Sequence, residues 1–403
     1  HFHHDARAFM AQHHGEQAFG VVTAQGEGVG VADAGMGDLD QHLASLGHGH
    51  IHFNDLKGFL GFEGYGGAGL DHPGFSRGLK IDCSSVKHGC LINNPGESKT
   101  INVEIARLHT TTKLNIPIMV RRSKFEGPIV LFSAGIHGDE INGVEIVRQL
   151  IHKKINKPKR GTTICIPIIN VYGFVNKSRE FPDGRDLNRV FPGSKNGSLA
   201  SRYAYHILTE IMPIVDYAVD FHAGGASRFN APQIRIAPSN TELKILADVF
   251  NAPFTLFSKN ISGSFRNSSE KLNVKMLLFE GGKSLDINNV VADEGINGAK
   301  RLLSHLGMLD PKHLLVEQKS KTIYIENSGW IRAKCSGMLH DYGTIGKFVK
   351  KGTVLGIITD PYGKFERKIK APNDGYIINA NHSPIVYQGD AIYHLSSALG
   401  EEG

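Results

Sequence analysis

Short apolar runs alternate with helical stretches from about residue 80 to residue 318. Such alternation is typical of an α/β domain, in which helices cover a sheet. Continuous apolar runs predict buried strands at 129–132, 162–169, 215–221 and 274–279. Helical periodicity and capping signals predict helices after Glu140 and over 199–211, 239–250 and 289–306. We interpret residues 80–318 as one α/β domain.

Helical signals vanish after about residue 319, and short strands punctuated by glycine follow. This pattern predicts a separate, small all-β domain at 319–403. Segments 346–356 and 371–375 resemble the barrel-sandwich module of biotinyl and lipoyl carriers, but the carrier lysine between two hydrophobic neighbours is absent. We therefore expect a structural or substrate-capping role for this domain.

Residues 1–79 differ in composition from the rest of the chain. They hold 17 of the 47 glycines and 10 of the 21 histidines, and no helical or alternating period extends beyond a few residues. The histidines lack the spacing of metal ligands. We interpret this segment as an atypical Gly/His-rich extension that is either an artefact of fragment or reading-frame assignment or dispensable.

Bulk properties exclude several classes of function. The net charge of +6 is scattered, without a basic stripe interleaved with aromatic residues, so we expect no nucleic-acid partner. No apolar run approaches the roughly 20 residues that cross a bilayer, so we expect no membrane association. Four cysteines are too few for a disulfide framework, and we expect a cytoplasmic protein. Whether it forms a homo-oligomer stays open.

Polar residues suited to one chemical site follow three of the predicted strands. His137 and Glu140 follow strand 129–132, His222 follows strand 215–221, and Glu280 follows strand 274–279. The carboxyl ends of strands in an open α/β sheet border the ligand crevice. Imidazole and carboxylate are both zinc ligands, and a catalytic zinc site needs three of them and one open position. A lone His-x-x-Glu pair is more often a solvated helix start, so the combination carries the prediction.

The turn-rich segment 183–193 contains Asp186-Leu-Asn188-Arg189 and is predicted to be an exposed loop. On the simpler interpretation, the charged side chains of this loop are only solvated and bind no ligand. Alternatively, Asn188 and Arg189 act together as donors, because a guanidinium can hold a carboxylate through two parallel hydrogen bonds.

Four motifs together resemble the succinylglutamate desuccinylase/aspartoacylase family, which is related to the zinc carboxypeptidases. They are His137-Gly-Asp-Glu140, Asp186-Leu-Asn188-Arg189, the strand-end His222 and the strand-end Glu280. The resemblance covers roughly residues 80–395. It implies a mostly parallel sheet flanked by helices, and hydrolysis of the amide bond of a small N-acyl amino acid.

The resemblance also implies roles for individual residues. His137, Glu140 and His222 match the zinc ligands, and Glu280 matches the catalytic carboxylate. Asn188 and Arg189 match the pair that holds the substrate carboxylate.

Two further assignments stay open. Arg179 is similar to the arginine that polarises the scissile carbonyl, but its stretched spacing to Asn188 makes Arg185 a rival. Members of the family also use a tyrosine from the C-terminal region, for which Tyr376, Tyr387 and Tyr393 are candidates.

The hypothesis from sequence is metal-assisted amide hydrolysis, in which zinc lowers the pKa of water and Glu280 moves the proton. The first alternative is a zinc carboxypeptidase acting on short peptides. The second is a non-catalytic zinc-containing binding protein. Cobalt or nickel could also fill such a site, and the sequence does not identify the acyl group or the amino acid.

Overall fold

The computed structural model describes residues 94–107, 110–238, 240–315 and 321–400. The predicted extension at 1–79 lies outside the described residues. So do residues 316–320, around which the boundary between the two predicted domains falls. Both domain boundaries therefore stay predictions.

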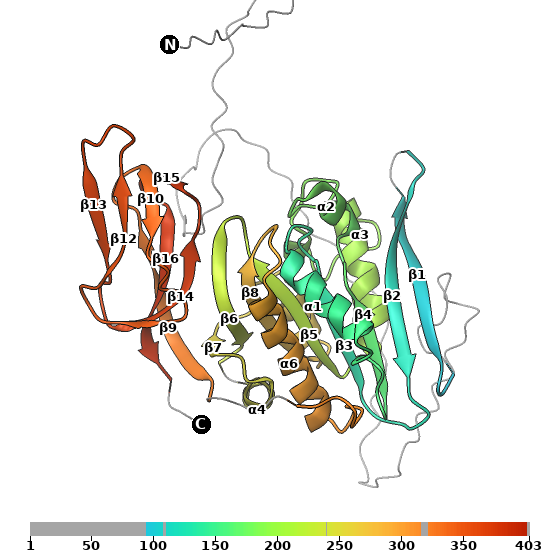
Figure 1. The fold of residues 1–403 in the computed structure, drawn as a ribbon. Helices are drawn as coiled ribbons and strands as arrows, with labels where there is room; N and C mark the ends of the chain where they lie inside the picture. The colour runs from blue at the N-terminus through green and yellow to red at the C-terminus, as the bar shows by residue number, and fades with distance from the viewer. Residues whose placement is uncertain (1–93, 108–109, 239, 316–320, 401–403) are drawn as a thin grey trace, which may run out of the picture. The chain divides into compact units, whose positions relative to one another are not determined.

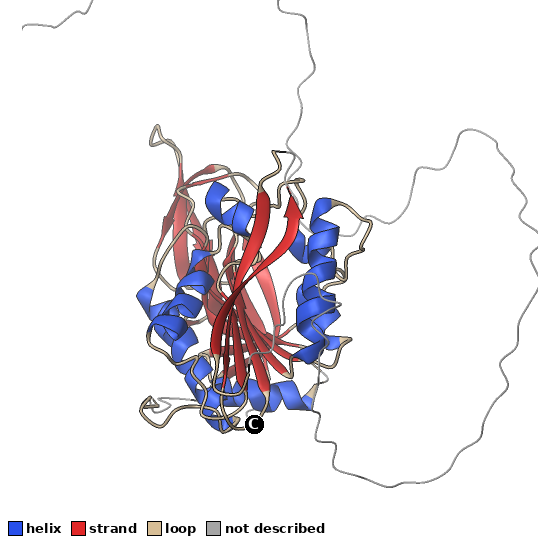
Figure 2. Cartoon of the chain, turned by 90° about the vertical axis from the view of Figure 1, so that its right-hand side faces the viewer, coloured by secondary structure: helices blue, strands red, loops and turns tan. Residues whose placement is uncertain are grey.

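The part of the chain described up to residue 315 contains eight strands and six α-helices (Figure 1). The strands are β1 (Ser98–Arg107), β2 (Lys113–Arg122), β3 (Ile129–Ala134), β4 (Thr162–Ile166), β5 (Tyr217–Gly224), β6 (Arg228–Ile236), β7 (Phe254–Phe257) and β8 (Lys275–Lys283). The helices are α1 (Ile141–His152), α2 (Val171–Asn176), α3 (Leu199–His206), α4 (Thr241–Phe250), α5 (Phe265–Glu270) and α6 (Asn289–His305). Figure 2 shows helices on both sides of the sheet, which confirms the predicted α/β class.

The large sheet is mixed rather than mostly parallel. It has 12 strands in the order β1-β2-β4-β3-β5-β8-β6-β7-β9-β16-β14-β11. Strands β4, β3, β5 and β8 run parallel to one another, and so do β6, β7 and β9. The β1-β2-β4 edge, the β8-β6 pair and the C-terminal strands are antiparallel. The central strands therefore pair in parallel, as expected. At the β1-β2-β4 edge and among the C-terminal strands the pairing is antiparallel, so the expectation of a mostly parallel sheet is wrong there.

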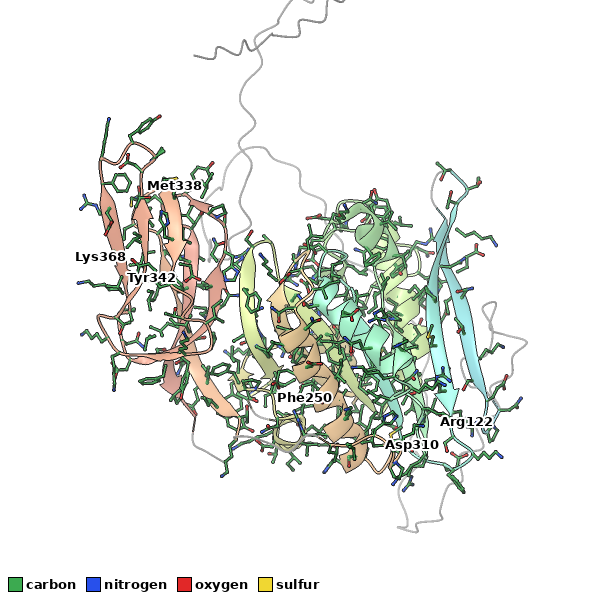
Figure 3. The ribbon with its side chains drawn as sticks, in the orientation of Figure 1. Arg122, Phe250, Asp310, Met338, Tyr342 and Lys368 are labelled. Carbon is green, nitrogen blue, oxygen red and sulfur yellow. The ribbon has the colours of Figure 1, made fainter. Side chains whose placement is uncertain are left out.

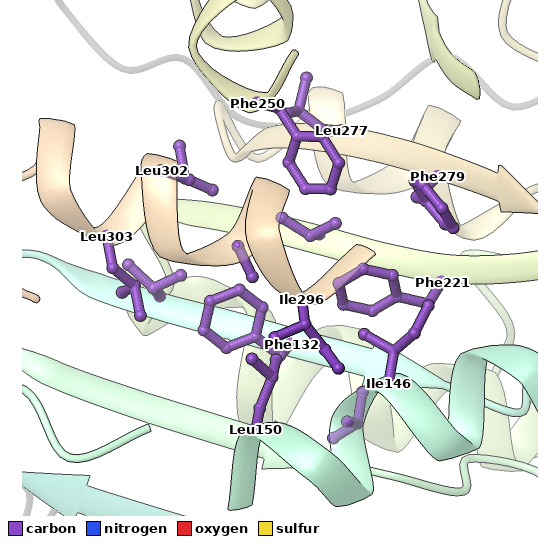
Figure 4. Packing of buried hydrophobic residues seen from close by; sticks show 14 of the residues in the cluster. Phe132, Ile146, Leu150, Phe221, Phe250, Leu277, Phe279, Ile296, Leu302 and Leu303 are labelled. Atoms are coloured by element: carbon purple, nitrogen blue, oxygen red, sulfur yellow. The ribbon is translucent and has the colours of Figure 1, made fainter. Parts of the chain in front are cut away.

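Alternate residues of the central strands enter two different cores. Phe132 packs with Phe221 and Phe279 beneath α1 and α6 (Figure 4), whereas Leu131 belongs to the cluster on the other face. Side chains on a strand alternate between faces, and helices cover both faces of these strands. This explains why the strands appear in the sequence as continuous apolar runs.

Several element ends differ from the sequence prediction. β5 continues through His222 to Gly224, and β8 continues through Glu280 to Lys283, so both residues lie within their strands. β4 ends at Ile166, before Pro167, which has no N–H to donate to a ladder. The helix predicted at 199–211 is α3 followed by a π-helical turn at Ile207–Ile211.

Every described element after residue 320 is a strand, as predicted. They are β9 (Ile323–Arg332), β10 (Gly337–Asp341), β11 (Phe348–Val349), β12 (Val354–Thr359), β13 (Glu366–Lys370), β14 (Gly375–Asn381), β15 (Ile385–Val386) and β16 (Ala391–Leu399). Four of them form a second sheet, β13-β12-β10-β15, while β14 pairs with β6 of the large sheet. These strands enclose a core of their own and expose side chains such as Met338 and Tyr342 (Figure 3). Among the described helices, none is long and apolar enough to cross a membrane.

In the C-terminal strands, the imidazole of His394 stacks on Trp330, which is the only tryptophan of the chain. The rings of His394 on β16 and Trp330 on β9 are 4.5 Å apart and 7° from parallel. Burial, with a smaller contribution from Arg235, lowers the pKa of His394 to about 4. The folded protein therefore holds this imidazole neutral at a pH where an unfolded chain protonates it.

This packing predicts that the free energy of unfolding falls as the pH drops from 6.5 towards about 4. The unfolded imidazole takes up a proton in this range, whereas the folded one resists it. The variant His394→Phe keeps a flat ring against Trp330 and should lose this part of the pH dependence. Chemical denaturation between pH 4 and 7 measures it, with the exposed His305→Phe as control. Equal pH dependence in the wild type and His394→Phe would contradict the prediction.

Candidate metal centre

Three predicted ligands converge in one buried cluster. Their donor atoms all lie within 4.8 Å of one another, and His137, Glu140 and His222 are 4%, 2% and 3% exposed. Nδ1 of His137 lies 2.6 Å from Oε1 of Glu140, and Nδ1 of His222 lies 2.9 Å from Oε2. Each imidazole thus turns the same nitrogen towards the shared carboxylate.

The cluster is built at the carboxyl ends of β3 and β5. Glu140 directly precedes α1, which begins at Ile141, in line with the helix predicted after Glu140. Between the two ligands, a Cβ atom on Gly138 would lie 1.9 Å from the backbone carbon of Gly173. Only glycine lets the β3–α1 corner pack this closely against α2, and this packing holds His137 and Glu140 in place.

The other nitrogen of each imidazole is held by a second carboxylate. Nε2 of His222 lies 2.8 Å from Oδ2 of Asp220, and Nε2 of His137 lies 3.2 Å from Oδ1 of Asp186. The hydroxyl of Ser133 donates to Asp220 at 2.7 Å. A carboxylate behind a metal-binding histidine fixes the orientation and tautomer of the ring.

Neither aspartate was identified from the sequence. A signal for Asp220 was present, because residues i and i+2 of a strand share a face and Asp220 therefore lies beside His222. Asp186 opens the Asp186-Leu-Asn188-Arg189 motif, in which only the asparagine and the arginine were assigned roles. Its distance of 49 residues from His137 leaves no local signal.

The charges of the cluster are strongly coupled. Burial acts to raise the pKa of Glu140, but the two neighbouring imidazoles outweigh it and hold that pKa well below its ordinary value. Burial acts to lower the pKa of His222, but Asp220 and Glu140 hold it well above 6.5. The pKa of His137 is likewise raised, mainly by Glu140 against the effect of burial. Because a cation would replace protons at these nitrogens, metal binding and proton release are coupled here.

The structure distinguishes the two rival arginines. Nη1 of Arg179 lies 3.3 Å from Glu140, and its Nη2 lies 2.8 Å from Asp186. The side chain of Arg179 is 32% exposed, so it contacts the cluster while part of it stays accessible. Arg185 is exposed and its guanidinium pairs with Asp183 at 3.2 Å. Arg179 therefore lies at the cluster, whereas the described contact of Arg185 is elsewhere.

The predicted carboxylate-binding pair lies beside Asp186 in a short 3₁₀ turn, Leu187–Arg189. Oδ1 of Asn188 accepts a hydrogen bond from the backbone N–H of Phe265 at 2.8 Å, which leaves its amide nitrogen for another partner. The Arg189 side chain is 42% exposed, with Nη1 lying 3.9 Å from Asp186. The backbone N–H of Asn188 also donates to Oδ1 of Asp186 at 2.8 Å, so both residues lie against the aspartate that holds His137.

Glu280 lies beside the cluster on the adjacent strand. It is the register partner of His222 in the parallel β5–β8 pair, and side chains at paired positions of neighbouring strands share a face. Its Oε2 accepts a hydrogen bond from Asn230 at 2.8 Å, and its Oε1 lies 3.9 Å from Nε of Arg235. Asn230 and Arg235, both on β6, were not identified from the sequence, because their approach depends on the antiparallel β6–β8 pairing.

The three candidate tyrosines have contacts within or on the C-terminal strands. The hydroxyl of Tyr393 is buried and donates to Asp341. The ring of Tyr376 packs against Phe254 and Phe348, and Tyr387 is 71% exposed. The structure does not single out one of them for the site.

Comparison with known proteins points to one family. A family model described as the succinylglutamate desuccinylase/aspartoacylase catalytic domain matches residues 126–306. The chain is 26% identical over 305 residues to the N-alpha-acetyl-L-2,4-diaminobutyric acid deacetylase of Halomonas elongata, covering 72% of this chain and 87% of that protein.

Solved structures share the fold. A succinylglutamate desuccinylase/aspartoacylase from Rhodobacter sphaeroides has a TM-score of 0.67 and 22% identity, covering 79% of this chain and all of that one. The product-bound ectoine utilization protein EutE (DoeB) from Ruegeria pomeroyi has a TM-score of 0.66 and 22% identity, covering 75% and 95%. The part of the chain that holds the cluster, residues 126–306, therefore matches the catalytic domain of the succinylglutamate desuccinylase/aspartoacylase family.

Proposed function

We propose that this protein is a zinc-dependent deacylase that hydrolyses the amide bond of an N-acyl amino acid. The observation that carries the proposal is the buried convergence of His137, Glu140 and His222 beside Glu280. The family match supports the same reaction class, because the Halomonas elongata relative is named as a deacetylase of an N-acetylated amino acid. In this proposal residues 80–318 form the catalytic domain, and residues 319–403 form a domain that narrows access to it.

The donor set fits zinc. Two imidazole nitrogens and a carboxylate are the three protein ligands typical of a catalytic zinc site, and the carboxylates behind both rings orient the Nδ1 atoms towards the cluster. These residues would hold zinc, which would supply Lewis acidity and lower the pKa of water towards neutrality. Closed structural sites use four ligands, so this donor set suits catalysis better than a structural role.

The side chains around the cluster have distinct roles in the proposed reaction. Glu280 accepts a proton from the attacking water and delivers it to the amine nitrogen as the C–N bond breaks. Arg179 donates to the carbonyl oxygen as negative charge develops there. Asn188 and Arg189 hold the carboxylate of the amino acid, which fixes the amide bond between Arg179 and Glu280.

Two alternatives remain distinguishable. A zinc carboxypeptidase would use the same ligands. The argument against it is that the C-terminal strands would narrow the entrance to the site and hinder long peptide substrates. A non-catalytic zinc-binding protein would have no need for Glu280 beside His222. The substrate panel below separates both from a deacylase.

We expect the wild type to hydrolyse N-acyl amino acids and to cleave short peptides much more slowly. Glu280→Gln should retain zinc while hydrolysis falls by at least about 100-fold, the lower range for removal of a general acid–base group. Amine release across N-acetyl and N-succinyl amino acids and dipeptides, with zinc content measured in parallel, tests both. Glu242→Gln, which removes a carboxylate in a surface ion pair with Lys275, is the control. Undiminished turnover by Glu280→Gln would refute the assigned base.

Removal of the carboxylate behind His222 should weaken metal binding without removing a ligand. Asp220→Asn should reduce zinc affinity by about 10- to 100-fold, because the imidazole loses its orienting acceptor. His222→Ala should lose the metal and all activity. Competition with a chromophoric chelator measures affinity, and Asp216→Asn, which lies just before the start of β5, should match the wild type. Equal affinities for Asp220→Asn and Asp216→Asn would contradict this arrangement.

The two arginines should differ sharply in their effect on catalysis. Arg179→Met should lower kcat by about 100-fold, as is typical for loss of one oxyanion donor. Arg185→Met should leave kcat near the wild-type value, since its guanidinium pairs with Asp183. Steady-state kinetics on zinc-loaded protein compares them. The reverse order of effects would assign the role to Arg185 instead.

A further inference from the structure

A buried pair of asparagines connects the C-terminal strands to Glu280. Nδ2 of Asn379 on β14 donates to Oδ1 of Asn230 on β6 at 2.7 Å, and Nδ2 of Asn230 donates to Oε2 of Glu280 on β8 at 2.8 Å. Asn230 and Asn379 are 3% and 4% exposed. We propose that both are positioning residues that fix the carboxylate of Glu280, an inference that rests on the proposed function.

We call the hydrogen-bonded chain Asn379–Asn230–Glu280 the asparagine relay, and strand pairing sets its position in the sheet. Asn230 is the register partner of Asn379 across β6–β14 and of Gly282 across β6–β8. The relay therefore crosses three strands that the sequence separates by up to 149 residues. Because β14 belongs to the C-terminal strands, these strands contribute to the geometry of the base as well as to access.

The direction of each hydrogen bond follows from the chemistry of the amide. Asn379 offers an N–H to Asn230, and only the carbonyl oxygen of Asn230 can accept it. This fixes the Asn230 amide with its nitrogen towards Glu280, where a carboxylate needs a donor. Without Asn379, the Asn230 side chain could turn over and place its oxygen against the carboxylate.

The relay is costly to bury, which argues for a role beyond packing. Oδ1 of Asn379 is buried and has no hydrogen-bond partner among the described residues. A buried polar atom without a partner destabilises a fold, and apolar residues of similar shape would avoid this cost. The role that we assign to the polar pair, despite this cost, is to orient the carboxylate of Glu280.

The relay also separates the two oxygens of Glu280 by function. Oε2 is held by Asn230, whereas the described neighbour of Oε1 is Nε of Arg235 at 3.9 Å, beyond hydrogen-bond distance. In the proposed reaction, Oε1 is therefore the oxygen that remains for proton transfer. A twist of the carboxylate plane away from this orientation would misplace the oxygen that acts as the base.

Substitutions at position 379 test the relay without touching substrate, metal ligands or Glu280. Asn379→Leu and the isosteric Asn379→Asp both remove the donor and should lower kcat about 10-fold, the effect of losing one hydrogen bond to a charged network. KM and zinc content should change little. Asn381→Ala, two residues along the same face of β14, is the matched control and should keep the wild-type kcat.

A double-mutant cycle distinguishes positioning from a general disturbance. Asn230→Leu alone should lower kcat about 10- to 100-fold. Adding Asn379→Leu to it should cause no further loss, because Asn379 acts only through Asn230. Multiplicative losses, or wild-type kcat in both Asn379 variants while Glu280→Gln is inactive, would overturn the relay and leave the proposed function standing. An active Glu280→Gln would instead refute the function on which the relay rests.

Discussion

The site depends on one buried carboxylate shared between two imidazoles. Nδ1 of His137 and Nδ1 of His222 both contact the carboxylate of Glu140. This carboxylate also accepts a hydrogen bond from the backbone N–H of Ala223 at 3.0 Å. A carboxylate this deeply buried is stable only because positive or polar groups surround it. Taking away one imidazole would leave a buried negative charge without compensation. The same arrangement makes the cluster receptive to a divalent cation.

The sheet supplies the rigidity that this cluster needs. β3 and β5 are adjacent and parallel, so Ser133 faces Asp220 at register and holds the carboxylate that orients His222. Helices α1 and α6 pack on one face through Phe132 and Phe221, and this packing fixes the strands from which the ligands project. The asparagine relay extends the same logic to Glu280, since β6 and β14 hold its partner donors. Ligands, base and supporting groups are thus all placed by strand register.

The sequence predicted the features that are local and missed those that depend on register. His137, Glu140 and His222 were found because each follows a recognisable apolar run, and the structure brings them together. The α/β class and the β-rich C-terminal region follow equally from local patterns. The mixed sheet was not foreseen, because apolar runs do not show strand direction. Asn230 and Asn379 carried no local signal at all, since their contact joins strands 149 residues apart.

Anomalous diffraction from crystals of the zinc-loaded protein tests whether the buried cluster is the metal site. We expect one zinc ion per chain, bound by Nδ1 of His137, Nδ1 of His222 and the carboxylate of Glu140, with zinc–nitrogen distances of about 2.0–2.1 Å. Asp186 and Asp220 should remain on the Nε2 atoms. Zinc bound through Nε2, or an ion outside this cluster, would refute the proposed metal centre.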